Sequence, residues 1–534
     1  MSARPDRLRA TERDETLIRS LSRPEAYPHP APDIEVLETH ISWVVLAGEF
    51  AYKIKKPVRL GFLDFSTLDL RRRFCEEELR LNRQWAPQIY LDVVPISGTA
   101  DHPRVGGDGP SIEYAVKMAR FPQQAILAAE LEAGRLTGDD MIEIAEMLAA
   151  RHGQSLQVRV KGEDAVLDVS APMLENFDYL ADRLEDGAYT SLKYWTETNL
   201  RSLDGVLRHR AEAGFVRECH GDLHLGNLVR LPSGIVAFDC IEFDAALRTI
   251  DVVSDVAFLV MDLVAHGRRD LAYGFLNRYF ECTGDYDGVR VLALYVVYHC
   301  LIRAKVLAIR SAERSAGRDR RRDLDEMRHY CDVASDWMPE HVPALLIMCG
   351  LSGSGKTWLS SRIMLSLPAI RIRSDIERRR LAGIDETTRS GSGVGRGIYA
   401  PAMTRTTYGR LLQAARPALQ SGMDAILDAS FLHRSDRYSA RRLAEDFRAA
   451  FLIVEVRAPG DVLAERVKGR MREGRDASEA DARVLEHQLA IVEGLDEAEH
   501  EQALQFDTSG VTDAAEFVDR VRAAIGRPLS DPKV

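Results

Sequence analysis

The pattern of apolar and polar positions divides the chain into segments of different kinds. From Ile41, the text HISWVVLAGEFAYKIKKPV carries two runs rich in apolar and β-branched or aromatic residues on either side of the turn 47–49, which predicts two β-strands. In the next stretch, Leu70, Phe74 and Leu81 recur at helical spacing among charged residues. This spacing predicts a helix over residues 68–84.

The middle of the chain is predicted to be mainly helical. Two further strands, LDVVPI and EYAVKMARF, come first, and amphipathic patterns then predict helices over 139–151 and 175–213. A loop-and-strand region follows over 218–244, and helical segments continue to about residue 330. The last stretch, 311–330, is dense in charges of both signs, which is typical of an exposed, salt-bridged helix. A nucleic-acid-binding patch is the alternative interpretation of the same residues.

The pattern changes again near Pro343. ALLIMCG is a short buried strand that runs into a glycine-rich turn, and the strands AIRIRS, DAILDAS and AFLIVEVRAP then alternate with helices. Such alternation predicts a parallel sheet with helices on both faces. We therefore expect four segments: an arm over 1–34 that is either ordered by its contacts or loose, a first domain over 35–335, a linker over 336–345, and a second domain over 346–534.

Composition restricts the possible classes of function. The 534 residues are 46% hydrophobic and 29% charged, and the net charge of −11 with 7% aromatic residues argues against broad nucleic-acid binding. None of the seven cysteines lies in a CxxC pair, so we expect neither a disulfide framework nor a metal site of that kind. The N-terminus has no apolar signal segment, and the longest apolar run, 291–302, is too short to cross a membrane. We expect a cytoplasmic protein without a membrane partner.

The most specific local signal lies at the start of the second domain. The text GLSGSGKT matches GxxxxGK[ST] and follows a predicted strand, with a predicted helix after it. Backbone N–H groups of such a loop cradle phosphate oxygens, the lysine reaches the β- and γ-phosphates, and the hydroxyl after it binds Mg²⁺. The ATP-binding residues predicted here are Gly350, Ser352, Gly353, Ser354, Gly355, Lys356 and Thr357.

Carboxylates and arginines follow the later strands of this domain. Asp428 ends a strand and could bind Mg²⁺ as a Walker-B-type aspartate does. Asp375 follows another strand and could accept a proton from an acceptor hydroxyl, while Arg378 binds the substrate; a helix N-cap is the alternative role for Asp375. An arginine-rich stretch holds Arg466, Arg470, Arg472 and Arg475, of which we assign Arg470 and Arg475 to ATP, with a solvated helix face as the alternative.

This second domain resembles the small P-loop kinases of the adenylate, gluconate and polynucleotide kinase type. The matching text is GLSGSGKT, IRSDIERRRL, ILDASFLHRSDR and the lid-like RVKGRMREGR. The resemblance covers about 346–534 and implies a five-stranded P-loop core. It also implies phosphorylation of a small hydroxyl compound or of a nucleic-acid end, without naming the acceptor.

The first domain carries a second pattern suited to phosphoryl transfer. HGDLHLGN contains Asp222, the candidate base, and Asn227 five residues later, and the strand IVAFD ends at Asp239. Asn227 and Asp239 offer oxygen ligands for Mg²⁺, and the spacing is that of the catalytic loop of protein kinases. Gly221 stands where those kinases usually have arginine.

HGDLHLGN followed by FD resembles the aminoglycoside phosphotransferase family, over roughly 35–310. The text AYK places Lys53 as the nucleotide lysine, although strand alternation puts Lys55 on the same face. One of Glu76, Glu77 and Glu78 on the next helix could pair with that lysine, and we favour Glu78. The resemblance implies a two-lobed kinase-like fold with YAVKMARFP as the hinge strand, and ATP-dependent transfer to a small-molecule hydroxyl.

The first domain also departs from the kinase pattern. There is no GxGxxG before Lys53, where only AGEF occupies the turn. Glu242 and Asp244 could add metal ligands or could simply cap and solvate their loop. We expect the two aspartates that follow, Asp251 and Asp255, to hold the catalytic loop, and His220 to be a packing residue. A pseudokinase that binds nucleotide without transfer is the alternative for the whole constellation.

Together these patterns predict a mixed α/β and α+β chain: a two-lobed protein-kinase-like domain, then a P-loop NTPase domain with a parallel sheet and helices on both faces. The expected function is a two-module phosphotransferase that uses ATP and Mg²⁺ to phosphorylate hydroxyls of a sugar, amino sugar or aminoglycoside-like molecule. The alternatives are a nucleic-acid end kinase and a non-catalytic ATP-sensing regulator. The family name does not identify the substrate, because no carboxylate cluster for a polycation can be located.

Overall fold

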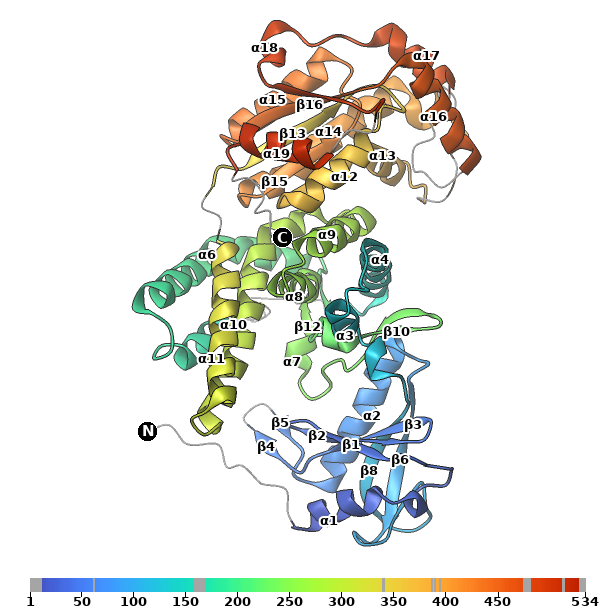
Figure 1. Cartoon of the computed structure of the whole chain (residues 1–534), viewed down its shortest axis with the longest axis vertical. Coiled ribbons are helices and arrows are strands. Elements are labelled where there is room, and N and C mark those ends of the chain that lie inside the picture. Colours follow the sequence, from blue (N-terminus) through green and yellow to red (C-terminus); the bar gives the residue numbers. More distant parts are fainter. Residues whose placement is uncertain are drawn as a thin grey trace. The chain divides into compact units, whose positions relative to one another are not determined.

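The computed structural model describes residues 12–60, 63–157, 169–338, 341–385, 388, 390–392, 395–473, 482–510 and 514–527. Contacts divide the chain into two compact units, drawn together in Figure 1. The first comprises 1–167 and 210–259, and the second comprises 168–209 and 260–534. These units follow contacts rather than chain order, and the domain limits predicted at 335 and 346 stay a prediction.

The first unit is built on a six-stranded antiparallel sheet of order β1-β2-β3-β8-β6-β7. Strands β2 and β3 form the hairpin predicted around residues 47–49, and nearly all of their side chains are buried, since both faces of the sheet are covered. The strands are β1 (Glu35–Glu38), β2 (Ser42–Ala47), β3 (Phe50–Lys55), β6 (Tyr90–Gly98), β7 (Pro103–Val105) and β8 (Ser111–Ala119).

The N-terminal arm covers one face of this sheet. Helix α1 (Glu12–Leu21) and the 3₁₀ turn η1 (Pro24–Ala26) place Leu17, Leu21 and Tyr27 in one apolar cluster with strand residues. Tyr27 also donates a hydrogen bond to the Leu21 carbonyl at 2.7 Å. The described part of the arm is therefore ordered by its contacts.

Helix α2 (Leu68–Trp85) covers the opposite face. Thr67 caps its first turn by accepting a hydrogen bond from the Leu70 N–H group, and Cys75 contributes its side chain to the apolar cluster beneath. The helix ends at Trp85, one residue after the predicted end at residue 84. Its buried face also carries Glu78 and Asn82, two polar side chains that matter for the site.

The first unit contains further short strands, 3₁₀ turns and helices. They are the short pair β4 (Arg59–Leu60) and β5 (Leu63–Asp64), then η2 (Gln123–Ala125), α3 (Leu127–Glu132), α4 (Gly138–Gln154), β9 (Val216–Glu218), η5 (Leu225–Asn227), β10 (Leu228–Leu231), β11 (Gly234–Ala237), α7 (Ala245–Arg248) and β12 (Thr249–Asp251). Helix α8 (Val252–Ala265) crosses from the first unit into the second.

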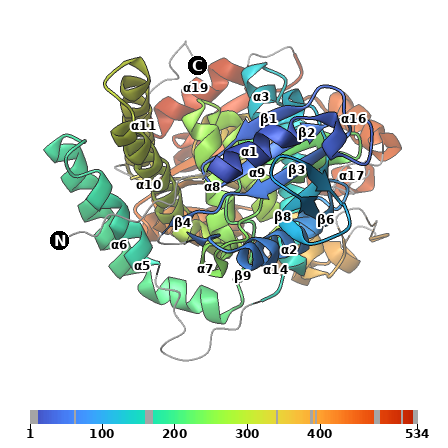
Figure 2. The same ribbon diagram turned by 90° about the horizontal axis from the view of Figure 1, so that it is seen from below.

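Helices make up the first part of the second unit. They are α5 (Ser170–Glu175), η4 (Asn176–Tyr179), α6 (Asp186–Glu212, which crosses the division), α9 (Arg269–Thr283), η6 (Tyr286–Gly288), α10 (Val289–Glu313) and α11 (Arg318–Asp336). The helix predicted over 175–213 is interrupted, because the chain turns after η4, where Phe177 and Leu180 are completely buried. Figures 1 and 2 both show α10 and α11 side by side. In α11, Asp323 pairs with Arg310 and Arg314 of the preceding segment, as expected for a salt-bridged helix.

Among the residues that the structure describes, one helix is long and apolar enough to cross a membrane by length and composition. It runs over Tyr286–Glu313, and 61% of its most apolar window is buried inside the protein. A core helix of a globular fold passes the same test, and α10 buries its apolar side chains against α11 and other elements. The helix continues well beyond the apolar run 291–302.

The last part of the second unit is a five-stranded parallel sheet of order β14-β15-β13-β16-β17. Its strands are β13 (Ala344–Cys349), β14 (Ala369–Arg373), β15 (Asp424–Asp428), β16 (Ala450–Arg457) and β17 (Ala503–Asp507). The strand pattern had not indicated β17. This sheet, with the antiparallel sheet of the first unit, confirms the predicted fold class.

Helices cover both faces of the parallel sheet. Side chains of α12 (Lys356–Ser366) and α19 (Ala514–Ala524) share an apolar cluster with Leu346 and Val454. The other contacting helices include α14 (Pro401–Gln420) and α15 (Arg434–Asp446). The remaining elements are α13 (Ser374–Leu381), η7 (Gly397–Tyr399), α16 (Gly460–Glu473), α17 (Ala482–Ile491) and α18 (Glu497–His500).

Candidate active sites

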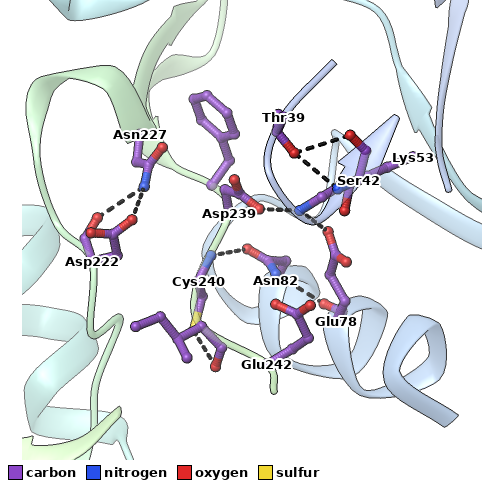
Figure 3. A network of polar contacts seen from close by, with 12 residues as sticks. Thr39, Ser42, Lys53, Glu78, Asn82, Asp222, Asn227, Asp239, Cys240 and Glu242 are labelled. Atoms are coloured by element: carbon purple, nitrogen blue, oxygen red, sulfur yellow. Dashed lines mark hydrogen bonds and ion pairs between the residues drawn. The ribbon is translucent and has the colours of Figure 1, made fainter. Parts of the chain in front are cut away.

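Two lysines and three carboxylates alternate in a row in the first unit that is buried except at Asp239, and most of this row is visible in Figure 3. Lys53 of β3 binds Asp239 and also Glu78, at 2.8 Å between Nζ and Oε1. Lys55, two residues along the same strand face, binds the other Glu78 oxygen at 2.7 Å and also binds Glu242. Glu78 is therefore the helix residue that pairs with the lysines, and it serves both of them.

The other two glutamates of α2 point elsewhere. Glu76 pairs with Arg72 on the exposed side of the helix. Glu77 pairs with Arg80 and Arg248. The period of the helix thus separates three consecutive glutamates, and only one of them faces the lysines.

The charges in this row shift one another's protonation equilibria. Burial alone would raise the pKa of Glu78, but the two ammonium groups outweigh it and lower that pKa from 4.5 to about 2. Burial alone would lower the pKa of Lys53, but Asp239 and Glu78 hold it well above its usual value. Both side chains are therefore charged across the physiological pH range.

Asp222 and Asn227 lie together on the catalytic-loop sequence. The Asn227 amide donates two hydrogen bonds to Asp222, at 3.0 Å to its carboxylate Oδ2 and 3.0 Å to its backbone carbonyl. His224 Nε2 lies 3.6 Å from the same carboxylate oxygen. Figure 3 shows the amide oxygen of Asn227 turned away from Asp222, which leaves that oxygen available to a cation.

Buried groups hold this loop from behind. Asp255 of α8 accepts hydrogen bonds from the backbone N–H groups of His220 and Gly221, each at 2.8 Å, and lies 3.3 Å from His152 Nε2. The His220 ring contacts the Phe238 carbonyl at 2.9 Å and packs edge-on against Trp85, while burial lowers its pKa. Asp251 instead binds Arg210, at 2.7 Å between Oδ2 and Nε. Asp255 thus holds the loop and His220 packs behind it, as expected, whereas Asp251 binds Arg210 rather than the loop.

Asp239 adopts a backbone conformation that is rare for aspartate. Its φ of 62° lies in the left-handed region, and its side chain is 43% exposed although Lys53 binds it. The Asp239 N–H donates to the buried Tyr90 hydroxyl at 3.0 Å, and the next N–H, of Cys240, donates to Asn82 Oδ1 at 2.9 Å. Strained backbone held by several bonds is typical of functional sites.

The turn before β2 differs from the turn expected to cover phosphates. The residues AGEF span the turn that joins β2 to β3. The sheet has an earlier turn, 39–41, which joins β1 to β2. That turn contains no glycine, and Thr39 closes it by accepting a hydrogen bond from the Ser42 N–H at 3.0 Å. This observation extends the departure from the glycine-rich pattern to the turn that precedes β2.

The donor groups of the first site fit a magnesium nucleotide. The half-exposed Asp239 carboxylate and the turned-away Asn227 amide oxygen are hard oxygen ligands, which Mg²⁺ prefers. Lys53 brings a positive charge to the same place. Glu242 is buried on Lys55 and Asp244 caps α7, so neither contributes its carboxylate in this arrangement.

The phosphate-binding loop of the second unit connects β13 to α12. Gly350, Gly353 and Gly355 have φ values of 150°, 85° and 93°, which side chains rarely permit. A Cβ at Gly353 would lie 2.9 Å from the Leu463 carbonyl oxygen. The loop therefore requires glycine at these positions, and its shape fits a phosphate group at the N-terminus of α12.

Polar side chains of this loop contact the protein itself. Lys356 Nζ donates to the Leu351 carbonyl at 2.8 Å, and Thr357 is exposed at the start of α12. The buried Asp428 accepts a hydrogen bond from Ser360 Oγ at 2.9 Å. Lysine, hydroxyl and carboxylate converge at the carboxyl ends of β13 and β15, and this donor set fits ATP with Mg²⁺.

The remaining predicted residues of the second unit lie on two segments. Asp375 is in the first turn of α13, whose N-cap is Arg373, so the alternative role of Asp375 as N-cap does not hold. Arg378 is 9% exposed, lies 3.9 Å from Asp375 and sits over the Tyr399 ring at 5.0 Å. Arg470 belongs to α16, and Arg475 lies outside the described residues.

Three residues at the sites were not predicted from the sequence: Gln488, Tyr90 and Asn82. The N–H of Ser352 donates to Gln488 Oε1 of α17 at 2.8 Å, which places an amide oxygen on the phosphate loop. Tyr90 and Asn82 bind the backbone beside Asp239. No local sequence motif marks Gln488, Tyr90 or Asn82. The one available signal concerned Asn82, which is a polar residue on the predicted apolar face of a helix.

Comparisons with known proteins give several similarities. A family model described as an AAA domain matches residues 345–495. Among solved structures, a choline/ethanolamine kinase family protein from Mesorhizobium loti is 15% identical, covers 60% of this chain and 94% of its own, and has a TM-score of 0.37. A gluconokinase from Sinorhizobium meliloti 1021 is 20% identical, covers 35% of this chain and 94% of its own, and has a TM-score of 0.24.

A relative with the same span exists in mycobacteria. The uncharacterized protein Rv2004c of Mycobacterium tuberculosis (strain ATCC 25618 / H37Rv) is 31% identical over 458 residues, which are 84% of this chain and 89% of the relative. The similarity therefore extends across both the kinase-like and the P-loop parts rather than one of them. The chain belongs to the same family as Rv2004c.

Proposed function

We propose that the chain is a two-module phosphotransferase that moves the γ-phosphate of ATP to hydroxyl groups of small molecules, such as a sugar, an amino sugar or an aminoglycoside-like compound. The observation that carries this proposal is the arrangement of Lys53, Asp239 and the Asp222–Asn227 pair in one unit. Phosphoryl transfer requires a cation on the phosphates, oxygen ligands for metal and a carboxylate beside the nucleophile.

In the first module, Asp222 accepts the proton of the acceptor hydroxyl, and the Asn227 amide keeps that carboxylate oriented. Lys53 binds the phosphates, with Glu78 fixing its position. Asn227 and Asp239 are the residues that would hold Mg²⁺. When bound, the metal neutralises charge on the phosphate oxygens.

In the second module, the loop N–H groups and Lys356 bind the phosphates, and Thr357 with Asp428 would hold Mg²⁺. Asp375 accepts the proton of a second acceptor, which Arg378 binds through its guanidinium. Arg470 and Arg475 would close over the transferring phosphate. A cytoplasmic location is part of the proposal, since all seven cysteines are free thiols.

The test is a screen of a metabolite pool with γ-labelled ATP, using the full chain and the variants Asp222→Ala, Lys356→Ala and the double variant. Each single variant should lose one set of labelled products, and the double variant should label nothing. Asp204→Ala and Lys193→Ala, which alter charged residues of α6, serve as matched controls. Labelling by the double variant equal to that of the unmodified chain would refute the proposal.

Other outcomes would redirect the assignment. Label transferred to the end of an oligonucleotide, and lost in Asp375→Asn, would make the second module a nucleic-acid end kinase. Nucleotide binding by both modules without labelled product would favour an ATP-sensing regulator.

A further inference from the structure

Helix α9 covers the outer edge of β14, the edge strand of the parallel sheet. The Asn277 side chain accepts a hydrogen bond from the Arg371 N–H at 2.6 Å and donates one to the Ala369 carbonyl at 3.0 Å. The amide thus occupies the place of a neighbouring strand on this edge. Asn277 is 1% exposed, so this contact is a buried part of the second unit.

One turn further along α9, Glu281 neutralises a buried arginine of the same strand. Glu281 Oε1 accepts from Arg371 Nη2 at 3.0 Å, and the exposed fractions of the two residues are 3% and 8%. Arg373 and Arg278 lie farther from this carboxylate, at 3.8 Å and 3.7 Å. A buried guanidinium keeps its position only while a counter-charge and hydrogen-bond partners hold it.

The other side of the Arg371 guanidinium contacts the first turns of α12. Nη1 donates to Ser361 Oγ and lies 3.5 Å from Ser360 Oγ. Ser361 Oγ donates to the Thr357 carbonyl at 2.8 Å, and Ser360 Oγ donates to Asp428 Oδ2 at 2.9 Å. A continuous polar path therefore runs from α9 to the two residues proposed to hold Mg²⁺.

We propose that Arg371 is a positioning residue of the P-loop site and that Glu281 of α9 sets its position, so that a helix preceding the P-loop sequence controls how well the site holds Mg²⁺. The inference rests on the proposed function. Partners one step removed from metal ligands commonly change metal affinity by about 10- to 100-fold when they are altered. Direct phosphate contacts by the loop N–H groups and Lys356 lie outside this path.

The test measures binding of ADP by the full chain, once with Mg²⁺ and once with a chelator. All variants carry Asp239→Asn, so that the Mg²⁺-dependent part of binding reports the P-loop site. Glu281→Gln should weaken Mg²⁺-dependent ADP binding about tenfold and leave metal-free binding within about twofold. Ser360→Ala should act in the same direction while keeping the Glu281–Arg371 pair.

A matched control separates this effect from general loss of an ion pair. Asp336→Asn removes the exposed pair with Arg269 at the start of α9 and should leave both affinities unchanged.

The double variant Glu281→Gln with Arg371→Gln removes both buried charges, so it should regain thermal stability without regaining Mg²⁺-dependent affinity. Recovery of both would assign a purely structural role to the pair and overturn the inference.

Failure of the inference and failure of the proposed function give different results. If Lys356→Ala abolishes Mg²⁺-dependent ADP binding in this background while Glu281→Gln and Ser360→Ala behave like Asp336→Asn, the positioning role is wrong and the nucleotide site stands. If Lys356→Ala changes nothing, the P-loop does not bind nucleotide and the proposed function of the second module fails as well.

Discussion

At the scale of single residues, the row of charges around Glu78 distinguishes the first module. The Glu78 carboxylate binds both Lys53 and Lys55, which lie on one face of β3. Each lysine also binds a second carboxylate from the segment after β11: Lys53 binds Asp239, and Lys55 binds Glu242. Lys53 and Asp239 belong to the proposed nucleotide site. Lys55 and Glu242 are more deeply buried, so their pair fixes the segment that carries Asp239 to strand β3.

Replacement of Asp222 tests its role as base. Asp222→Asn should lower turnover of the first module about 100- to 10,000-fold, because proton acceptance from the acceptor hydroxyl contributes about that factor. The KM for ATP should change little, since Asp222 is not a phosphate ligand in the proposal. Steady-state kinetics with an acceptor found in the screen measure both quantities, and Asp204→Asn is the control. A rise in KM with unchanged kcat would contradict the assignment.

Replacement of Glu78 tests the charge row through the pH dependence of stability. Because the pKa of Glu78 falls from 4.5 to about 2 on folding, its stabilising contribution is complete above the higher value and disappears as pH falls toward the lower one. Glu78→Gln leaves two buried ammonium groups short of a counter-charge and should cost about 3–5 kcal/mol near neutral pH.

Urea unfolding of both proteins between pH 7 and pH 3 measures this difference. The gap in unfolding free energy between the unmodified chain and Glu78→Gln should narrow as the pH falls. Burial and the neighbouring Glu78 charge raise the pKa of Glu242, so Glu78→Gln also lowers the Glu242 pKa, and Glu242→Gln in both proteins removes this contribution from the comparison. A gap that stays constant with pH would show that Glu78 is not charged in the folded chain.

At the scale of elements, local patterns predicted most strands and both motif loops. The hairpin around Gly48, helix α2 and the strand–loop–helix around GLSGSGKT depend on residues close in sequence, and all three are present. Partners far apart along the chain carried no such signal. Arg371 and Glu281 are individually unremarkable charged residues, and only the fold shows that each is buried on the other.

The phosphate loop offers a test at this scale. Gly353→Ala places a Cβ at a φ of 85° and 2.9 Å from a carbonyl oxygen, which should destabilise the second unit by about 1–3 kcal/mol. It should also weaken nucleotide binding, since the loop must shift. Gly409→Ala in α14, where a Cβ meets nothing within 4 Å, should be neutral or slightly stabilising. Thermal unfolding with and without ADP compares the two variants, and equal behaviour would contradict the argument.

At the scale of the whole molecule, compact units and chain order differ. Segments 168–209 and 260–336 precede the P-loop sequence but belong to the same unit as the parallel sheet.

The chain is acidic, with a net charge of −11, so each nucleotide site must create its own positive field. In the proposed P-loop site Lys356 and the start of α12 supply positive charge, whereas in the first unit three carboxylates outnumber Lys53 and Lys55, so the proposed Mg²⁺ would have to supply it there.

The cover that Asn277 forms over β14 also determines how the chain can be divided. A fragment over 341–534, which keeps the whole of β13, would expose an unpaired strand edge, and such edges template association with other chains. It would also leave Arg371 without Glu281. We expect this fragment to aggregate, whereas the whole chain, in which Asn277 covers that edge, stays dispersed. Light scattering of the two at equal concentration measures the difference, and a monodisperse short fragment would show that its edge is protected in another way.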